Sequence, residues 1–221
     1  MINPNMIYIK RGDFMERSEL KFRAKEQLRG NWGIAIGAVL LAAIFTDFDV
    51  IYNIGERFGL DGLTLSVPVN LLSLFLGGVI TTGLCKLLLN LATNIEKPKV
   101  ENLFSYFNIY LKTLGLNILI SLAVAIGTIL FIVPGIIVAL MFSQAFFILA
   151  EDSSKSITQC LSESTEMMKG YKADFFVLEL SFIGWWIVAA LTLGIGGLWV
   201  APYQKLTEAN YYLSLKGNKM Y

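Results

Sequence analysis

The longest apolar stretch of the chain runs from Leu114 to Ala150 and contains no charged residue. A single helix of that length would span roughly 55 Å, against roughly 30 Å for the hydrocarbon core of a bilayer. The stretch therefore predicts two antiparallel helices, at about residues 113–133 and 136–150. Pro134 and Gly135 are predicted to form the hairpin turn, because proline removes a backbone donor and glycine tolerates the dihedral angles of a tight reversal.

Other apolar segments predict further membrane spans. The first lies at about residues 32–45, the second begins at Pro68 and ends near residue 92, and the fifth covers residues 174–193 before the sequence GIGG. Residues 198–215 are ambiguous: they could cross about 27 Å, yet they are too polar for a helix that faces lipid. The segment either spans the membrane inside a bundle or lies on its surface.

Polar segments with helical periodicity predict short interfacial helices. Residues 16–32 form a basic helix, interpreted either as lying on anionic lipid or as a solvated flank that sets orientation. Apolar residues recur at helical spacing in residues 103–111, which predicts an aromatic belt. Residues 153–172 predict a surface helix that begins after Ser153 or Ser154 and ends at Gly170. The residues that share one face of this helix are Ile157, Cys160, Leu161, Ser164 and Met168.

The distribution of lysine and arginine favours six spans over five. With six spans and both termini cytosolic, fifteen basic residues lie inside and only Arg57 lies outside, whereas five spans give thirteen inside and four outside. Cytoplasmic loops are enriched in lysine and arginine. The sequence thus predicts a cytosolic basic arm (residues 1–31), a single transmembrane domain (32–215) with an acidic outer loop at residues 47–67, and a cytosolic tail (216–221).

Composition supports an all-α, polytopic membrane protein. Hydrophobic residues make up 55% of the chain and charged residues 16%, against roughly a quarter charged in soluble domains. The absence of histidine removes the commonest metal ligand and general base. Cys85 and Cys160 have no metal-type spacing. We therefore predict no catalytic residues, no metal and no cofactor, and the short basic arm, interleaved with acidic residues, gives no support for nucleic-acid binding.

Two features could serve packing or function. Gly33 and Gly37 have the GxxxG spacing that lets helices approach closely, with a partner helix either in the same chain or in a second protomer. Glu179, Lys205 and Glu208 fall within predicted spans, where an unpaired charge is costly. We expect them to form either an ion-pair cluster that docks the last two helices or a site for a solute or proton.

Several sequence blocks occur in an order that resembles the bacterial integral membrane family called domain of unknown function 975. The blocks are ERSELKFRAKEQLRGNW, VENLF, IVPGIIVALMFSQAFFILAED, CLSESTEMMKGYKADFF, LSFIGWW and GIGGLWVAPYQKLTEANYY. The resemblance covers about residues 16–213, so Met6 and Met15 are alternative start positions. It implies a multi-pass protein of the bacterial cytoplasmic membrane and implies no activity.

Three functional classes are therefore compatible with the sequence. The first, which we favour, is a non-enzymatic membrane scaffold, assembly factor or envelope component that contacts the lipid bilayer and other membrane proteins or a second copy. The second is a small transporter of an amphipathic or lipid-like solute that uses Glu179, Lys205 and Glu208. The third is a lipid-modifying enzyme, for which Glu179 and Glu208 would be the carboxylate pair. A helix bundle without a charged, water-accessible cavity would favour the scaffold.

Overall fold

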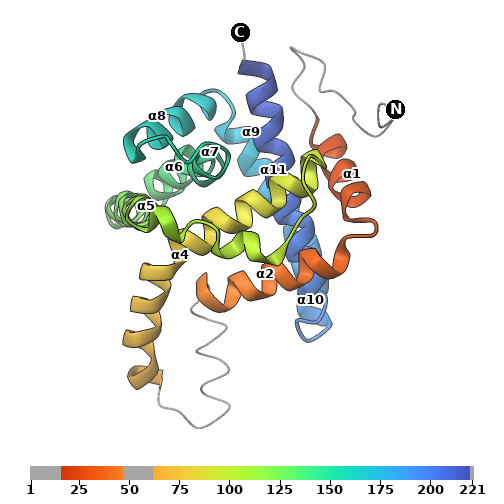
Figure 1. The fold of residues 1–221 in the computed structure, drawn as a ribbon, viewed down its shortest axis with the longest axis horizontal. Helices are drawn as coiled ribbons and strands as arrows, with labels where there is room; N and C mark the ends of the chain where they lie inside the picture. The colour runs from red at the N-terminus through yellow and green to blue at the C-terminus, as the bar shows by residue number, and fades with distance from the viewer. Residues whose placement is uncertain (1–15, 47–61, 220–221) are drawn as a thin grey trace.

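The computed structural model describes residues 16–46 and 62–219, and within these residues it contains helices and no strands (Figure 1). The side chains of residues 62–72 and 219, and most of the predicted acidic loop, lie outside this description. The helices are α1 (Arg17–Leu28), α2 (Trp32–Thr46), α4 (Gly62–Thr93), η1 (Val100–Phe104), η2 (Phe107–Ile109), α5 (Tyr110–Leu130), α6 (Ile132–Phe142), α7 (Ala145–Glu151), α8 (Ile157–Met167), α9 (Lys172–Leu180), α10 (Ile183–Leu191) and α11 (Gly197–Lys219).

Four helical segments of the described chain are long and apolar enough to cross a membrane. They are Ser73–Thr93, Val100–Leu130, Ile132–Glu151 and Lys172–Leu191, and the bent pair α1–α2 makes a fifth if it counts as one span. The helical membrane fold is therefore confirmed, and the predicted count of six is approximate. The difference arises at α2, which has only 15 residues and counts only together with α1, and at α11, which is long enough to cross but too polar to face lipid.

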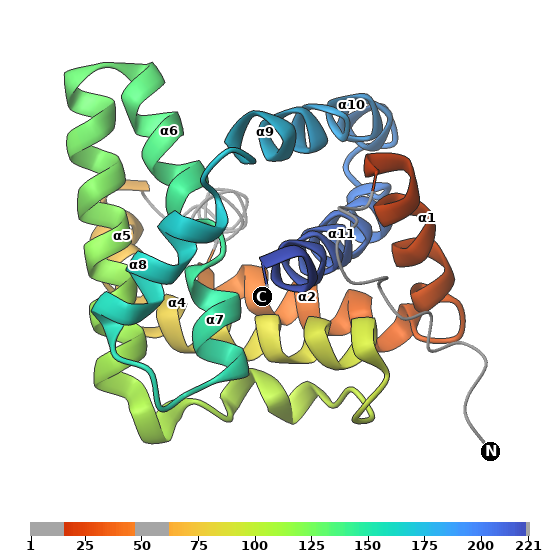
Figure 2. The same ribbon diagram turned by 90° about the horizontal axis from the view of Figure 1, so that it is seen from above.

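The long apolar stretch folds into the α5–α6 hairpin, whose helices lie side by side (Figure 2). The chain reverses at Phe131, which has an extended conformation with φ −163° and ψ 151°. The turn thus precedes the predicted one, and Pro134 is the third residue of α6. Proline is tolerated there because the first N–H groups of a helix lack intrahelical partners. Gly135 serves close packing, since a Cβ on it would lie 2.9 Å from the Cα of Thr128.

Two predicted spans contain breaks. The helix expected at residues 136–150 is divided into α6 and α7 by a turn at Ser143–Gln144, where the buried Ser164 hydroxyl accepts a hydrogen bond from the Gln144 N–H (3.2 Å). The fifth span is divided into α9 and α10 at Ser181–Phe182. At such a break, some backbone N–H and C=O groups have no hydrogen-bond partner within the helix, and a side chain can provide one.

Glycines of α4, which begins at Gly62 and not at Pro68, allow the following segments to press against it. A Cβ on Gly83 would lie within 2.5 Å of the Cα and carbonyl carbon of Leu103 in η1, and a Cβ on Gly78 would lie 2.8 Å from the Thr113 carbonyl carbon in α5. Leu103 is completely buried. The predicted interfacial segment is therefore present as two short 3₁₀ helices, of which η1 packs directly on α4.

The basic helix α1 packs into the bundle. It is bent by 105° from α2, with Gly30 in the left-handed region at φ +79°. Leu20, Ala24 and Leu28 form its fully buried face, and its main partner is α11. This arrangement shows that α1 is not a flank solvated on all sides, because an apolar stripe on it is covered by protein. Contact of its outer face with lipid stays a prediction.

Among the described residues of this chain, no helix packs against the GxxxG residues of α2, and a partner helix in a second protomer stays a prediction. Gly33 and Gly37 are exposed, and a Cβ on either would meet no atom within 4 Å. The small residues that do pack are Ala35, Ala38 and Ala42, all buried. The two sets lie on different sides of one helix, so a small-residue pattern alone does not identify the side that a neighbour covers.

The last helix, α11, lies in the middle of the molecule. Figure 2 shows it nearly end-on, with α1, α4, α7 and the α9–α10 segment around it. Most of its side chains from Tyr203 to Leu215 are buried, including Thr207, Asn210 and Ser214. Its polar sequence is thus explained by burial against other helices, where each polar group needs a partner.

Candidate functional site

The predicted cluster of Glu179, Lys205 and Glu208 is partly assembled. The Nζ of Lys205 lies 3.0 Å from both carboxylate oxygens of Glu208, one helical turn away on α11. The Glu208 side chain is 14% exposed and that of Lys205 is 46% exposed. A carboxylate this well covered requires a cation or several donors, which Lys205 supplies.

Glu179 joins the cluster through a residue that sequence reasoning missed. Gln204 donates from its Nε2 to the Glu179 carboxylate (2.5 Å), and its Oε1 accepts a hydrogen bond from the Trp186 indole (2.7 Å). One amide therefore connects α9, α10 and α11. The second Glu179 oxygen, Oε1, is buried and receives no hydrogen bond from the described residues. Gln204 stood among the polar residues of α11, but its partners could not be inferred from helical spacing.

Two lysines of α1 lie over aromatic rings beside this cluster. Lys21 donates to the Ser181 carbonyl oxygen (3.2 Å) at the α9–α10 break, and its Nζ lies 4.3 Å from the Phe182 ring centroid. Lys25 lies 5.3 Å from the Tyr203 ring centroid and 5.5 Å from that of Trp185. Aromatic faces attract cations. These contacts hold α1 against the α9–α11 corner.

A reciprocal amide pair binds α1 to the centre of the bundle. The Gln27 side chain donates from its Nε2 to the Oδ1 of Asn210 (3.1 Å), and Asn210 donates back from its Nδ2 to the Oε1 of Gln27 (2.7 Å). The same Gln27 amide also donates to the carbonyl oxygen of Ala92 near the end of α4 (2.9 Å). Three helices thus meet at two carboxamides, and the buried Asn210 is satisfied.

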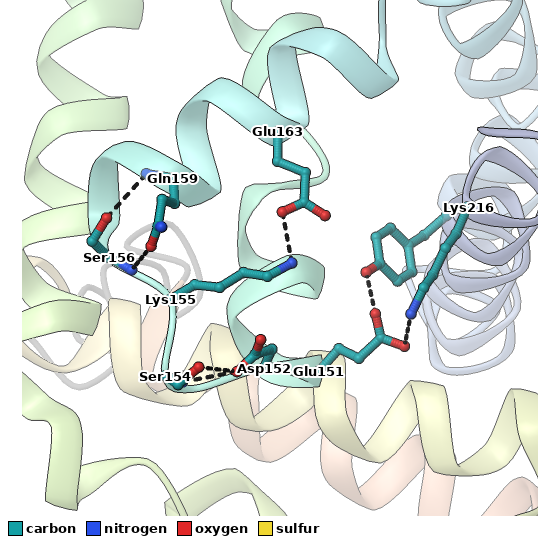
Figure 3. Close-up of polar contacts among 9 residues, drawn as sticks. Glu151, Asp152, Ser154, Lys155, Ser156, Gln159, Glu163 and Lys216 are labelled. Carbon is teal, nitrogen blue, oxygen red and sulfur yellow. Dashed lines mark hydrogen bonds and ion pairs between the residues drawn. The ribbon is translucent and has the colours of Figure 1, made fainter. Parts of the chain in front are cut away.

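A second polar cluster surrounds the C-terminal part of α11 (Figure 3). Glu151, the last residue of α7, accepts a hydrogen bond from the Tyr212 hydroxyl (2.7 Å) and pairs with Lys216 (2.6 Å). Tyr212 is almost completely buried. Because α7 ends at this carboxylate, the pair fixes the end of α11 against the start of the α7–α8 connection.

The α7–α8 connection is stabilised by its own polar groups (Figure 3). The Ser154 hydroxyl and backbone N–H both donate to Asp152, which holds the pKa of that carboxyl below its ordinary value. Ser156, and not Ser153 or Ser154, is the N-cap of α8 and forms a capping box with Gln159. Lys155 pairs with Glu163 at 2.6 Å.

The buried face of α8 matches the sequence prediction. Cys160, Ser164 and Met168 are completely buried, and burial raises the pKa of the Cys160 thiol. Cys85 and Cys160 are both free. In the part of the chain that the structure describes, no three His, Cys, Asp or Glu side chains are grouped to hold a metal ion. What the arrangement provides is a set of paired polar groups between helices.

Comparison with known proteins identifies the family. Two overlapping segments, residues 15–137 and 125–219, match the model of the family described as protein of unknown function DUF975. No curated protein and no solved structure matches the chain. The matched segments include the α5–α6 hairpin and the whole of α11, and they confirm the resemblance seen in the sequence blocks. The chain therefore belongs to the DUF975 family of proteins of unknown function.

Proposed function

We propose that this protein is a non-enzymatic scaffold of the bacterial cytoplasmic membrane that binds other membrane proteins or further copies of itself. The observation that carries the proposal is the use of polar side chains of α11 as ties between helices. Asn210 binds α1, Gln204 binds α9 and α10, and Tyr212 binds α7. Polar groups engaged in this way make a bundle rigid, which supports a structural role.

The proposed orientation has both termini in the cytosol. It is supported by contacts between basic segments far apart in sequence: Lys216 near the C-terminus pairs with Glu151, and Lys112 at the start of α5 donates to the Ser153 carbonyl oxygen (2.9 Å). Both lysines contact the start of the α7–α8 connection, which the proposed orientation puts on the cytosolic side, where lysine and arginine are enriched. A periplasmic phosphatase fused after Lys219 should be inactive, and a cytosolic reporter fused there should be active. The reverse pattern would overturn this orientation.

A second candidate is a small transporter for an amphipathic or lipid-like solute or a proton. One specific observation favours it, namely that Glu179 has a buried carboxylate oxygen without a hydrogen-bond donor among the described residues. Buried carboxylates inside a membrane are commonly parts of proton and solute pathways. In this alternative, Glu179, Lys205 and Glu208 are the groups that bind the transported species.

A charge-free double variant separates the two functions. Lys205→Met leaves the covered Glu208 carboxylate unpaired and should lower the yield of folded protein, whereas Lys205→Met with Glu208→Gln removes both charges and should restore it. Folded yield is measured by size-exclusion chromatography in detergent. Function is measured by comparing the growth of deletion and complemented strains under envelope stress, and proton flux is measured in proteoliposomes.

The scaffold predicts that the double variant rescues the deletion strain as well as the wild type does and that neither protein conducts protons. The matched control is Lys155→Met with Glu163→Gln, which removes an ion pair between the α7–α8 connection and α8, outside the cluster. If the double variant is folded but fails to rescue while the control succeeds, the charges of α11 have a direct function. That result would overturn the scaffold in favour of the transporter.

A further inference from the structure

A polar pocket of about 240 Å³ lies between α4, the η1–η2 segment and the α7–α8 connection. Its lining residues are Lys86, Asn102, Ser105, Tyr106, Asn108 and Ser153. They include one cation, two carboxamides and two serines, but no carboxylate. The pocket is separate from the clusters around Glu179 and Glu151. Its chemistry therefore suits a ligand that is anionic and offers several hydrogen-bond acceptors.

Donors remain available in this pocket. The Lys86 ammonium pairs with Glu96 at 3.6 Å, and because an ammonium group has three N–H donors, it can also donate to a ligand. The Asn102 side chain accepts a hydrogen bond from the Lys99 backbone N–H through its Oδ1 (2.9 Å), so its NH₂ group is the part left to donate. The hydroxyls of Ser105 and Tyr106 already donate to the backbone carbonyl oxygens of Glu101 and Ala150. The donors left for a ligand are therefore Lys86, Asn102, Asn108 and Ser153, and a lysine with neutral donors suits a phosphate group.

The η1–η2 segment arranges its side chains in three rows with a period of three residues, as expected for 3₁₀ geometry. One row, Leu103 and Tyr106, is buried against the bundle. The row at 102, 105 and 108 lines the pocket. The remaining row carries Phe104 and Phe107, which are 42% and 46% exposed, with Leu111 beyond them 78% exposed. Polar pocket and apolar row thus lie next to each other along the same segment.

The apolar row indicates where the rest of the ligand lies. The rings of Phe104 and Phe107 stack at 6.4 Å, and the segment opens the apolar stretch Val100–Leu130 that is long enough to span the membrane. Aromatic side chains concentrate at the headgroup level of membranes. We propose that the pocket binds the phosphate headgroup of an anionic glycerophospholipid, whose acyl chains lie along Phe104, Phe107 and Leu111. This site is independent of the proposed scaffold role.

Purified full-length protein in a neutral detergent provides the test. Native mass spectrometry measures retention of phosphatidylglycerol against phosphatidylcholine added in equal amounts. The wild type should retain phosphatidylglycerol preferentially, and Lys86→Gln should weaken this preference about tenfold, the effect of one charge-assisted hydrogen bond. Lys97→Gln is the matched control, since Lys97 is exposed in the α4–η1 connection and does not line the pocket. Equal retention by both variants would overturn the proposal.

A second pair of variants tests the pocket independently, in case Lys86→Gln does not fold. Asn108→Asp places a negative charge on the exposed wall of the pocket, and Asn94→Asp makes the same change outside it, at a residue with φ 52° that aspartate tolerates. Only Asn108→Asp should reduce phosphatidylglycerol retention. Inorganic phosphate is added in a separate arm. If phosphate binds the wild type without reducing its preference for phosphatidylglycerol, the pocket is not a lipid headgroup site. Normal lipid retention by Asn108→Asp would lead to the same conclusion.

Discussion

The contact between Gly83 and Leu103 gives the sharpest test of how this bundle is packed. A Cβ at position 83 would lie within 2.5 Å of three backbone atoms of Leu103, whereas carbon atoms in contact are about 3.5–4.0 Å apart. Gly83→Ala therefore forces η1 away from α4 by about 1 Å. The obstacle is backbone, so no side-chain rotation relieves it.

The expected cost follows from two opposing effects. Overpacking of this kind destabilises by about 1–3 kcal/mol, and the upper end applies because Leu103 is completely buried and Tyr106 is tied to the Ala150 carbonyl oxygen. Replacing glycine by alanine inside a helix contributes about 1 kcal/mol in the other direction. The net destabilisation is thus about 2 kcal/mol, or roughly a thirtyfold change in the unfolding equilibrium constant.

Gly77 provides a matched control on the same helix. A Cβ there would lie 3.5 Å from the Asn117 amide nitrogen and 4.0 Å from the Ser73 hydroxyl, which are ordinary contacts. Gly77→Ala should be neutral or stabilising by up to about 1 kcal/mol. Unfolding is followed by tryptophan fluorescence in mixed micelles titrated with sodium dodecyl sulfate. If Gly83→Ala is as stable as Gly77→Ala, η1 is not seated on α4 as described.

Three further predictions concern the polar end of the bundle. Glu151→Ala should destabilise the protein by about 1–3 kcal/mol in the same titration, because the buried Tyr212 hydroxyl loses its acceptor; an equal loss in Glu151→Gln would contradict this, since Gln retains an acceptor. Ser156→Ala should cost about 1 kcal/mol and speed amide exchange in α8 alone. The Ser154 donors stabilise ionised Asp152, so its contribution is present above about pH 4 and is lost as pH falls through its lowered pKa. Wild-type amide protection in the α7–α8 connection should decline at acid pH, and Asp152→Asn should remove this dependence; an unchanged pH profile in Asp152→Asn would refute it.

Local features of the chain were predictable where they depend on neighbours in sequence. The uncharged stretch from Leu114 to Ala150 had to fold back because of its length, and it does so as the α5–α6 hairpin. The buried face of α8 follows from the helical period of Cys160, Ser164 and Met168. Even here the exact turn shifted to Phe131, because proline is acceptable both between helices and in a first helical turn.

What covers each face was decided only by the tertiary structure. A helical period defines a side of α2 but does not distinguish Gly33 and Gly37, which are open, from Ala35 and Ala38, which are buried. The polar character of α11 was visible in the sequence. Its position at the centre was not, because partners such as Gln27 for Asn210 lie 183 residues away. Such pairs form only after neighbouring helices have brought their polar groups out of water together, and no local spacing encodes that choice.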